Sequence, residues 1–145
     1  MLKTDGVNID AMAKELAVAM PRLARKISFD FFKSINIPHA QIFTMLILCE
    51  KDLCRISDIR QELDIRASTA SGIIDRLVKS GHVKRLVDKN DRRVVNISLT
   101  AKGERVLTKL KEVIEFKWIN ILSKLSNEDR MNYLNIIRKI QRIIS

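Results

Sequence analysis

A short run of charged residues in the middle of the chain holds side chains suited to binding phosphate groups. The run Asp88-Lys89-Asn90-Asp91-Arg92-Arg93 places two adjacent arginines after two carboxylates. A guanidinium stays charged at neutral pH, and its planar fork of donors matches the geometry of a phosphate. A carboxylate beside two guanidiniums usually fixes at least one of them, so Asp91 is a candidate partner for either arginine. The run therefore predicts a basic contact point at Arg92 or Arg93.

Positive charge is concentrated around this run. The chain has 27 Lys and Arg against 17 Asp and Glu, a formal net charge of +10. Residues 76–111 contain 11 basic and three acidic residues, so this segment alone carries a net charge of +8. A spread excess of charge indicates only solubility, whereas a clustered one indicates a binding surface. The distribution predicts a polyanionic partner.

Residue types that support catalysis or metal binding do not form a matching set in the sequence. Cys49 and Cys54 lack a second pair at metal-ligand spacing, and His39 and His82 have no nucleophile or carboxylate set around them. We therefore expect no enzyme activity, no catalytic residues, no metal ion and no cofactor.

The N-terminus has no apolar signal core and no stretch is long enough to cross a bilayer, which predicts a cytoplasmic protein without membrane contact.

Two helices joined by a three-residue turn must position the polar residues that precede the charged run. Ser57 is the expected cap of a short helix with Ile59 and Leu63 on its inner face, and residues 64–66 form the turn. The next helix is expected from Ala67 to Lys79, and Gly81 ends it. Its inward residues are Ala70, Ile73, Ile74 and Leu77. This arrangement predicts a helix-turn-helix over about residues 56–79.

A change of hydrophobic period follows that helix. Val95, Ile97 and Leu99 alternate with polar or smaller residues, which is typical of a strand, and residues 83–87 can pair with them. The charged run then becomes the tip of a β-hairpin over about residues 83–99. A major groove about 12 Å wide admits one helix, and a narrow minor groove attracts an inserted arginine. A helix followed by a basic hairpin therefore predicts a unit that binds double-stranded DNA.

Long amphipathic helices flank this unit. Apolar residues recur every three or four positions from Ile9 to Phe31, with a kink or break expected at Pro21, and a further helix spans about His39 to Cys49. Thr100 is expected to cap the helix after the hairpin, and Ser126 with Asp129 to cap the last helix. The predicted fold is mainly α with a small β-hairpin wing, in a single domain over residues 1–145.

These segments resemble the MarR family of winged helix-turn-helix regulators. The resemblance covers Leu63 to Leu107 and is strongest in the charged run and in the segment Ile97-Ser98-Leu99-Thr100-Ala101-Lys102-Gly103. Family members show an Asp-x-x-Asp-Arg-Arg wing followed by Leu-Thr-x-x-Gly at the start of the next helix. The Asp75 to Gly81 segment resembles the end of the family's recognition helix, and Ile37 to Gln41 the start of its second helix.

The resemblance implies a sequence-specific regulator of transcription, expected to be a repressor, that acts as a homodimer. A winged helix-turn-helix lobe over residues 37–99 would contact the DNA, and residues 8–35 and 100–145 would supply dimerisation helices. Gly72 departs from the family, in which this position often carries a longer polar or basic side chain. The expected DNA-binding residues are Arg66, Ser68, Thr69, Ser71, Gly72, Arg76, Lys89, Arg92 and Arg93.

Other interpretations remain open at this point. Arg76 and Lys79 suit ordinary solvated helix charges as well as phosphate contacts, and the lobe suits a protein-interaction module without specific DNA binding. Cys49 and Cys54 are expected to be structural thiols, with redox sensing as the alternative. The resemblance implies a small-molecule or redox effector, and core packing is the expected role for any one of the aromatic residues, with an effector pocket as the alternative. The residues that could line this pocket are Phe29, Phe31, Phe32, Phe43, Phe116 and Trp118, and the pocket is expected at Phe29, Phe32, Phe43 and Trp118.

Overall fold

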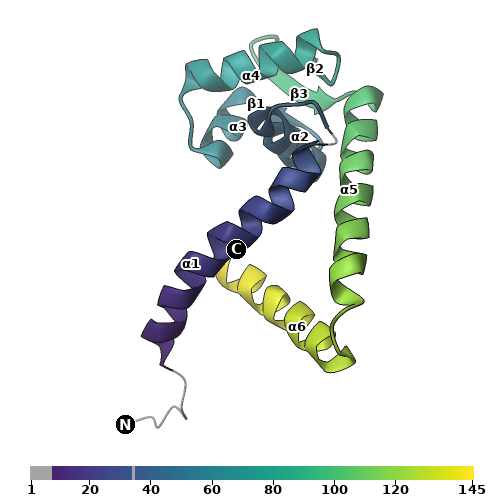
Figure 1. The fold of residues 1–145 in the computed structure, drawn as a ribbon. Coiled ribbons are helices and arrows are strands. Elements are labelled where there is room, and N and C mark those ends of the chain that lie inside the picture. Colours follow the sequence, from purple (N-terminus) through teal and green to yellow (C-terminus); the bar gives the residue numbers. More distant parts are fainter. Residues whose placement is uncertain (1–7, 34) are drawn as a thin grey trace. The chain divides into compact units, whose positions relative to one another are not determined.

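The computed structural model describes residues 8–33 and 35–145, and the side chains of residues 28–32 lie outside this description. The chain divides into two compact units, residues 1–106 and 107–145. Figure 1 shows the helices and the small antiparallel sheet in chain order. They are α1 Ile9–Lys33, α2 His39–Lys51, β1 Cys54–Arg55, α3 Ile56–Leu63, α4 Ala67–Lys79, β2 Val83–Val87, β3 Val95–Leu99, α5 Ala101–Leu122 and α6 Asn127–Ile144. The prediction of a mainly α fold with a β-hairpin wing is confirmed.

The core of the first unit lies between α2, α3, α4 and the sheet. Helix α2 packs against α3, α4 and β3, and α4 also packs against β2. Each element contributes fully buried side chains, which are Ile42, Met45, Leu48, Cys54, Ile59, Ile74, Leu77 and Ile97. Burial of one such large apolar side chain stabilises the fold by about 1.5–3 kcal/mol. These side chains fix α4 at the surface of the unit with one face turned outward.

Strand β3 is the centre of a three-stranded antiparallel sheet with the order β1-β3-β2. Val83 pairs with Leu99 and Val87 with Val95, so the hairpin has the predicted limits. The segment before α3 contributes the short strand β1, which the sequence did not predict and in which Cys54 pairs with Ile97. A strand of two residues has no alternating pattern that a sequence can display.

The ends of the helices follow the predicted capping residues in all but one case. Gly81 has a φ of 78° and follows α4, and the backbone N–H of His82 donates to the carbonyl oxygen of Leu77 at 2.9 Å. The prediction that Ser57 caps α3 is wrong, because the helix already begins at Ile56. Instead, the Asp58 carboxylate accepts a hydrogen bond from the backbone N–H of Arg55 at 2.9 Å.

Helix α1 continues through Pro21 without a break, which corrects the alternative of two shorter helices. A proline removes one backbone donor, and a long helix tolerates that loss at a single position. No helix in residues 8–33 or 35–145 combines the length and apolar character needed to span a membrane.

The second unit is a pair of helices, the later part of α5 and α6. The rings of Trp118 and Tyr133 lie 5.5 Å apart between their centroids. Arg130 Nε donates to the carbonyl oxygen of Leu122 at 2.6 Å, which satisfies an acceptor at the end of α5. Ser126 Oγ accepts from the backbone N–H of Asp129 at 3.1 Å, as the predicted capping residues require. These contacts fix the turn between the two helices.

Candidate nucleic-acid interface

The outward face of α4 carries the polar residues at the start of the predicted recognition helix. Ser68 and Thr69 are exposed, and Ser71 and Gly72 are half-buried. Ala70, Ile73, Ile74 and Leu77 are buried on the opposite face, as the sequence predicted. Arg66 is the N-cap residue, is exposed and forms no side-chain capping hydrogen bond. The first backbone N–H groups of α4 are thus left without a side-chain acceptor from that residue.

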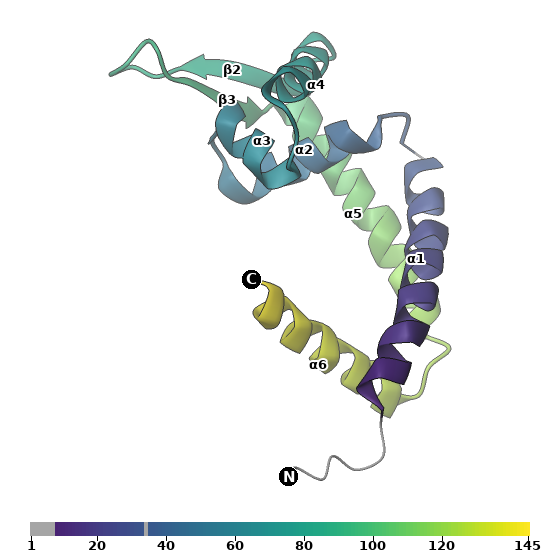
Figure 2. The same cartoon turned by 90° about the vertical axis from the view of Figure 1, so that its left-hand side faces the viewer.

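An ion pair links α4 to the wing. The guanidinium of Arg85 on β2 contacts the carboxylate of Asp75 on α4. Because α4 also packs directly against β2, the helix and the hairpin form one surface of the first unit. Figure 2 shows the hairpin extending from beside α4. The sequence did not predict this ion pair. Asp75 and Arg85 lie on either side of the turn at Gly81, and this position could have indicated that they approach each other.

Two aspartates shape the loop between β2 and β3. The carboxylate of Asp88 accepts hydrogen bonds from the backbone N–H groups of Asn90, at 2.8 Å, and Asp91, at 3.1 Å. These two bonds stabilise the ionised form and lower the pKa of Asp88 below its ordinary value. Asp91 accepts the backbone N–H of Arg93 at 2.9 Å. The sequence indicated charge at this loop but not its role in folding the turn.

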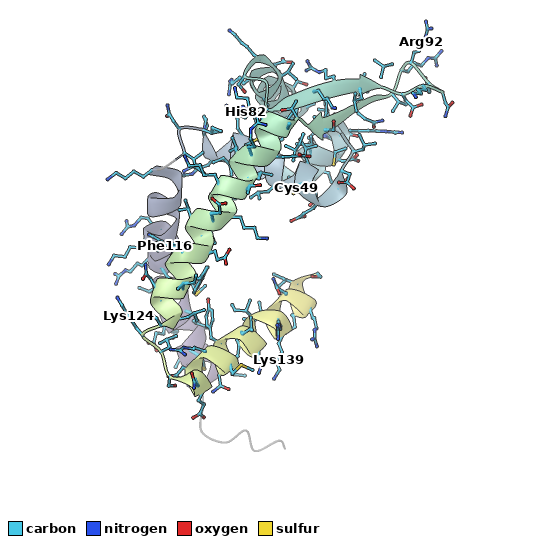
Figure 3. All side chains as sticks on the ribbon, turned by 90° about the vertical axis from the view of Figure 1, so that its right-hand side faces the viewer. Cys49, His82, Arg92, Phe116, Lys124 and Lys139 are labelled. Atoms are coloured by element: carbon cyan, nitrogen blue, oxygen red, sulfur yellow. The ribbon has the colours of Figure 1, made fainter. Side chains whose placement is uncertain are left out.

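The arginines of the loop lie at the far end of the wing. Arg92 is labelled at the tip of the hairpin in Figure 3, and Lys89, Arg92 and Arg93 are all exposed. The carboxylate of Asp91 is hydrogen-bonded to the main chain of Arg93 and not to either guanidinium. In the part of the chain that the structure describes, Arg92 and Arg93 form no ion pair. Both guanidiniums are therefore available to a polyanion.

The joint between α4, β2 and α5 is tightly bonded. Thr100 Oγ1 donates to the carbonyl oxygen of Gly81 at 2.6 Å, and Lys102 Nζ donates to that of Ser80 at 2.6 Å. Gly103 packs so closely that a Cβ at this position would lie 2.2 Å from the carbonyl oxygen of His82. The glycine expected in the segment after the wing is therefore required by close packing. The start of α5 holds the end of α4 in place.

His82 is buried at the centre of this joint. Its Nδ1 lies 2.6 Å from Ser80 Oγ, and only 8% of the residue is exposed. Burial of the imidazole, together with the positive charge of Lys102, lowers the pKa of His82 below its ordinary value. The neutral ring is thus the stable form at neutral pH. This places His82 in a structural role, away from the exposed face of α4.

The residues of the predicted effector pocket are only partly described. The side chains of Phe29 and Phe32 lie outside the described part of the chain. Phe43 is exposed on α2 in the first unit. Trp118, in the second unit, lines an apolar groove of about 500 Å³. The other residues of this groove are Leu122, Arg130, Met131, Tyr133, Leu134 and Ile137.

The two cysteines occupy different environments. Cys54 on β1 is buried, and burial raises the pKa of its thiol above the ordinary value. It is therefore a poor thiolate nucleophile. Cys49 on α2 is exposed.

The sequence of the chain is similar to known transcriptional regulators. A sequence model of the MarR family matches residues 37–95. The chain is 32% identical to the uncharacterised HTH-type transcriptional regulator YfiV of Bacillus subtilis, in a match that covers 66% of this chain and 60% of YfiV. It is 25% identical to the HTH-type transcriptional repressor MdtR of the same organism over 90% of this chain and 86% of MdtR.

The fold is similar to solved structures over nearly its whole length. A MarR family protein from Bacillus stearothermophilus has a TM-score of 0.84 at 22% identity, covering 96% of this chain and 99% of that one. A point mutant of MepR from S. aureus, bound to an oligodeoxyribonucleotide, has a TM-score of 0.65 at 20% identity, covering 97% of this chain and 100% of MepR. Over its winged helix-turn-helix at residues 37–95, the chain is therefore similar to the MarR family of transcriptional regulators.

Proposed function

We propose that the protein is a homodimeric repressor that binds a specific sequence of double-stranded DNA. The observation that carries the proposal is the joint surface of α4 and the wing, which the packing of α4 against β2 holds together and the contact of Asp75 with Arg85 spans. The solved structure of MepR with an oligodeoxyribonucleotide supports DNA as the partner. The similarity of residues 37–95 to a family of transcriptional regulators supports a regulator and not an enzyme.

In this proposal α4 enters the major groove and the wing reaches the adjacent minor groove. Ser68, Thr69, Ser71 and Gly72 face base edges, and Arg66 and Arg76 contact the flanking phosphates. Arg92 is the arginine that enters the minor groove, because it stands at the tip of the hairpin. The main chain of Arg93 is tied back to Asp91. Lys89 and Arg93 then contact the phosphates on either side.

Dimerisation would cover the exposed apolar faces of the flanking helices. In α1, Ile9 is 75% exposed, and in α6, Ile143 is 80% exposed. Other apolar residues of the two helices are also exposed, namely Met12, Leu16, Met20, Leu23, Met131, Leu134, Ile136 and Ile140. Monomeric proteins rarely expose apolar area on this scale, so a second copy is the expected cover for residues 8–35 and 100–145. Two recognition helices would then meet half-sites about 34 Å apart.

Repression and its relief are the finer part of the proposal. The similarity to MdtR, which is named a repressor, supports repression. A cytoplasmic small-molecule or redox effector would relieve repression by favouring a conformation of the dimer in which the spacing of the two recognition helices does not fit the operator. We propose Phe29, Phe32, Phe43 and Trp118 as the pocket for such an effector, with Phe29 and Phe32 outside the described side chains.

Selection of bound DNA from a random library tests the proposal most broadly. We expect the full-length protein to enrich a two-fold symmetric sequence and to protect it in a footprint. Binding to the enriched sequence should exceed binding to random duplexes by about 10³-fold or more at physiological salt. Equal binding to all duplexes would favour a protein-interaction module instead.

A further inference from the structure

Gly72 stands at the centre of the outward face of α4. The buried residues Ala70, Ile73, Ile74 and Leu77 define the inward face of the helix. Helical residues four apart lie above one another, so Gly72 falls directly between Ser68 and Arg76 on the opposite side. A residue in this position of a recognition helix lies close to the floor of the major groove.

Nothing in the folded chain requires a glycine at this position. A Cβ built on Gly72 meets no atom within 4 Å. The residue lies inside α4 and is not among the residues of positive φ, so its backbone suits any amino acid. Glycine in a helix interior is less stable than alanine by about 1 kcal/mol. The fold is therefore less stable with glycine at position 72 than it would be with alanine.

The missing side chain leaves the Cα of Gly72 bare on the surface that would face the bases. The backbone N–H and carbonyl groups of a helix interior are already paired, so Gly72 offers a base pair only its Cα. The polar edges of guanine, cytosine and adenine would lose their hydrogen bonds to water against such a surface. The C5-methyl group of thymine is the one apolar group that projects into the major groove. This methyl group alone would contact the bare Cα without that loss.

We propose that Gly72 is a specificity-determining residue whose bare Cα receives a thymine methyl group. The inference rests on the proposed DNA-binding function and adds the chemistry that one position of the helix recognises. The absence of a Cβ lets α4 lie closer to that base pair than an alanine would allow. Each half-site should then contain one thymine that is selected by shape.

The experiment combines the Gly72→Ala variant with DNA in which deoxyuridine, which lacks the methyl group, replaces each thymine in turn. For the unaltered protein, we expect one replacement per half-site to weaken binding about fourfold, the equivalent of one buried methyl group. The Gly72→Ala variant should bind the thymine operator at least about fivefold more weakly, because its Cβ overpacks the methyl group. The same variant should gain affinity, or lose none, when that thymine becomes deoxyuridine.

Controls separate this inference from the proposed function. The remaining thymines of the operator serve as matched controls, since their replacement should weaken binding by the same factor in both proteins. A thermal unfolding midpoint no lower than that of the unaltered protein shows that Gly72→Ala is folded. If the unaltered protein selects no sequence, the proposed function fails. If the protein selects a sequence, but Gly72→Ala changes affinity by the same factor whether or not each thymine carries its methyl group, only the inference is overturned.

Discussion

Among single residues, two glycines inside helices have opposite consequences for stability. Gly72 faces open space, whereas a Cβ on Gly103 would lie 2.2 Å from the carbonyl oxygen of His82. We predict that Gly72→Ala raises the free energy of unfolding by about 1 kcal/mol through helix propensity. Gly103→Ala should lower it by about 1–3 kcal/mol through overpacking. Urea unfolding measures both, and a stabilised Gly103→Ala would refute the close packing of the joint.

Arg92 and Arg93 form a matched pair for testing the wing. Arg92 lies at the tip and Arg93 is tied to Asp91 through its main chain. In a dimer, Arg92→Ala removes two charge contacts, so the slope of log affinity against log salt should become shallower by roughly 2. Arg93→Ala should also flatten the slope but preserve the preference for a narrow, A·T-rich minor groove. Titrations at several salt concentrations with both variants check this, and equal losses of sequence preference would contradict the assignment of Arg92.

At the scale of elements, the joint of α4, β2 and α5 predicts a dependence of stability on pH. The pKa of His82 is lowered because its ring is buried and lies near Lys102, while the unfolded chain keeps the ordinary value of 6.5. The unfolded state thus binds the proton more readily. The contribution of neutral His82 to the free energy of unfolding is therefore fully present above the ordinary histidine pKa. This contribution is lost as the pH falls from the ordinary pKa toward the lower pKa of the folded state.

Thermal unfolding at two pH values tests the role of His82. The melting temperature of the unaltered protein should fall between pH about 7.5 and about 5.5, on either side of the ordinary histidine pKa. His82→Asn removes the titrating group and should reduce that fall. An unchanged pH dependence in the variant would show that His82 does not carry it.

The sequence predicted the elements whose limits depend on local chemistry. The limits of α4 and of the two hairpin strands agree with the structure because apolar residues at the helical and strand periods face one core. Strand β1 depends on pairing with Ile97, more than 40 residues away, and no local pattern predicts it. The start of α3 at Ile56 depends on that strand, which holds Arg55 extended, so Ser57 was the wrong cap.

The candidate site was predictable in composition but not in internal contacts. The hydroxyl residues of α4 and the arginines of the wing follow from periodicity and charge. The contact of Asp75 with Arg85 joins two elements across a turn, and its geometry depends on the packing of α4 against β2. The roles of Asp88 and Asp91 in the loop likewise depend on backbone conformation. Sequence periodicity contains no information about these contacts.

For the whole molecule, the exposed apolar face of α6 predicts a dimer that a single charge can disrupt. Ile140 is exposed, and no residue of α6 is buried in the single chain. Ile140→Glu should leave the fold intact but place a charge in the proposed interface, which costs several kcal/mol of association when the charge is unpaired. Sedimentation of this variant should show monomer at concentrations where the unaltered protein is dimeric.

The neighbouring residue provides the control for the dimer. Lys139 is exposed on α6, so Lys139→Glu introduces the same side chain at a polar position. We expect this variant to remain dimeric and to retain tight binding to both half-sites. If the Ile140→Glu protein is still dimeric, the proposed role of α6 is wrong. If the unaltered protein is monomeric, the proposed dimer itself is wrong.

The central claim is that α4 and the wing of one chain contact adjacent grooves of the same duplex. Dimethyl sulfate protection on the selected operator tests it directly, because the reagent methylates guanine N7 in the major groove and adenine N3 in the minor groove. The unaltered protein should protect both kinds of atom in each half-site, and Arg92→Ala should lose adenine N3 protection while it retains guanine N7 protection. Loss of both protections together, or of neither, would contradict the account.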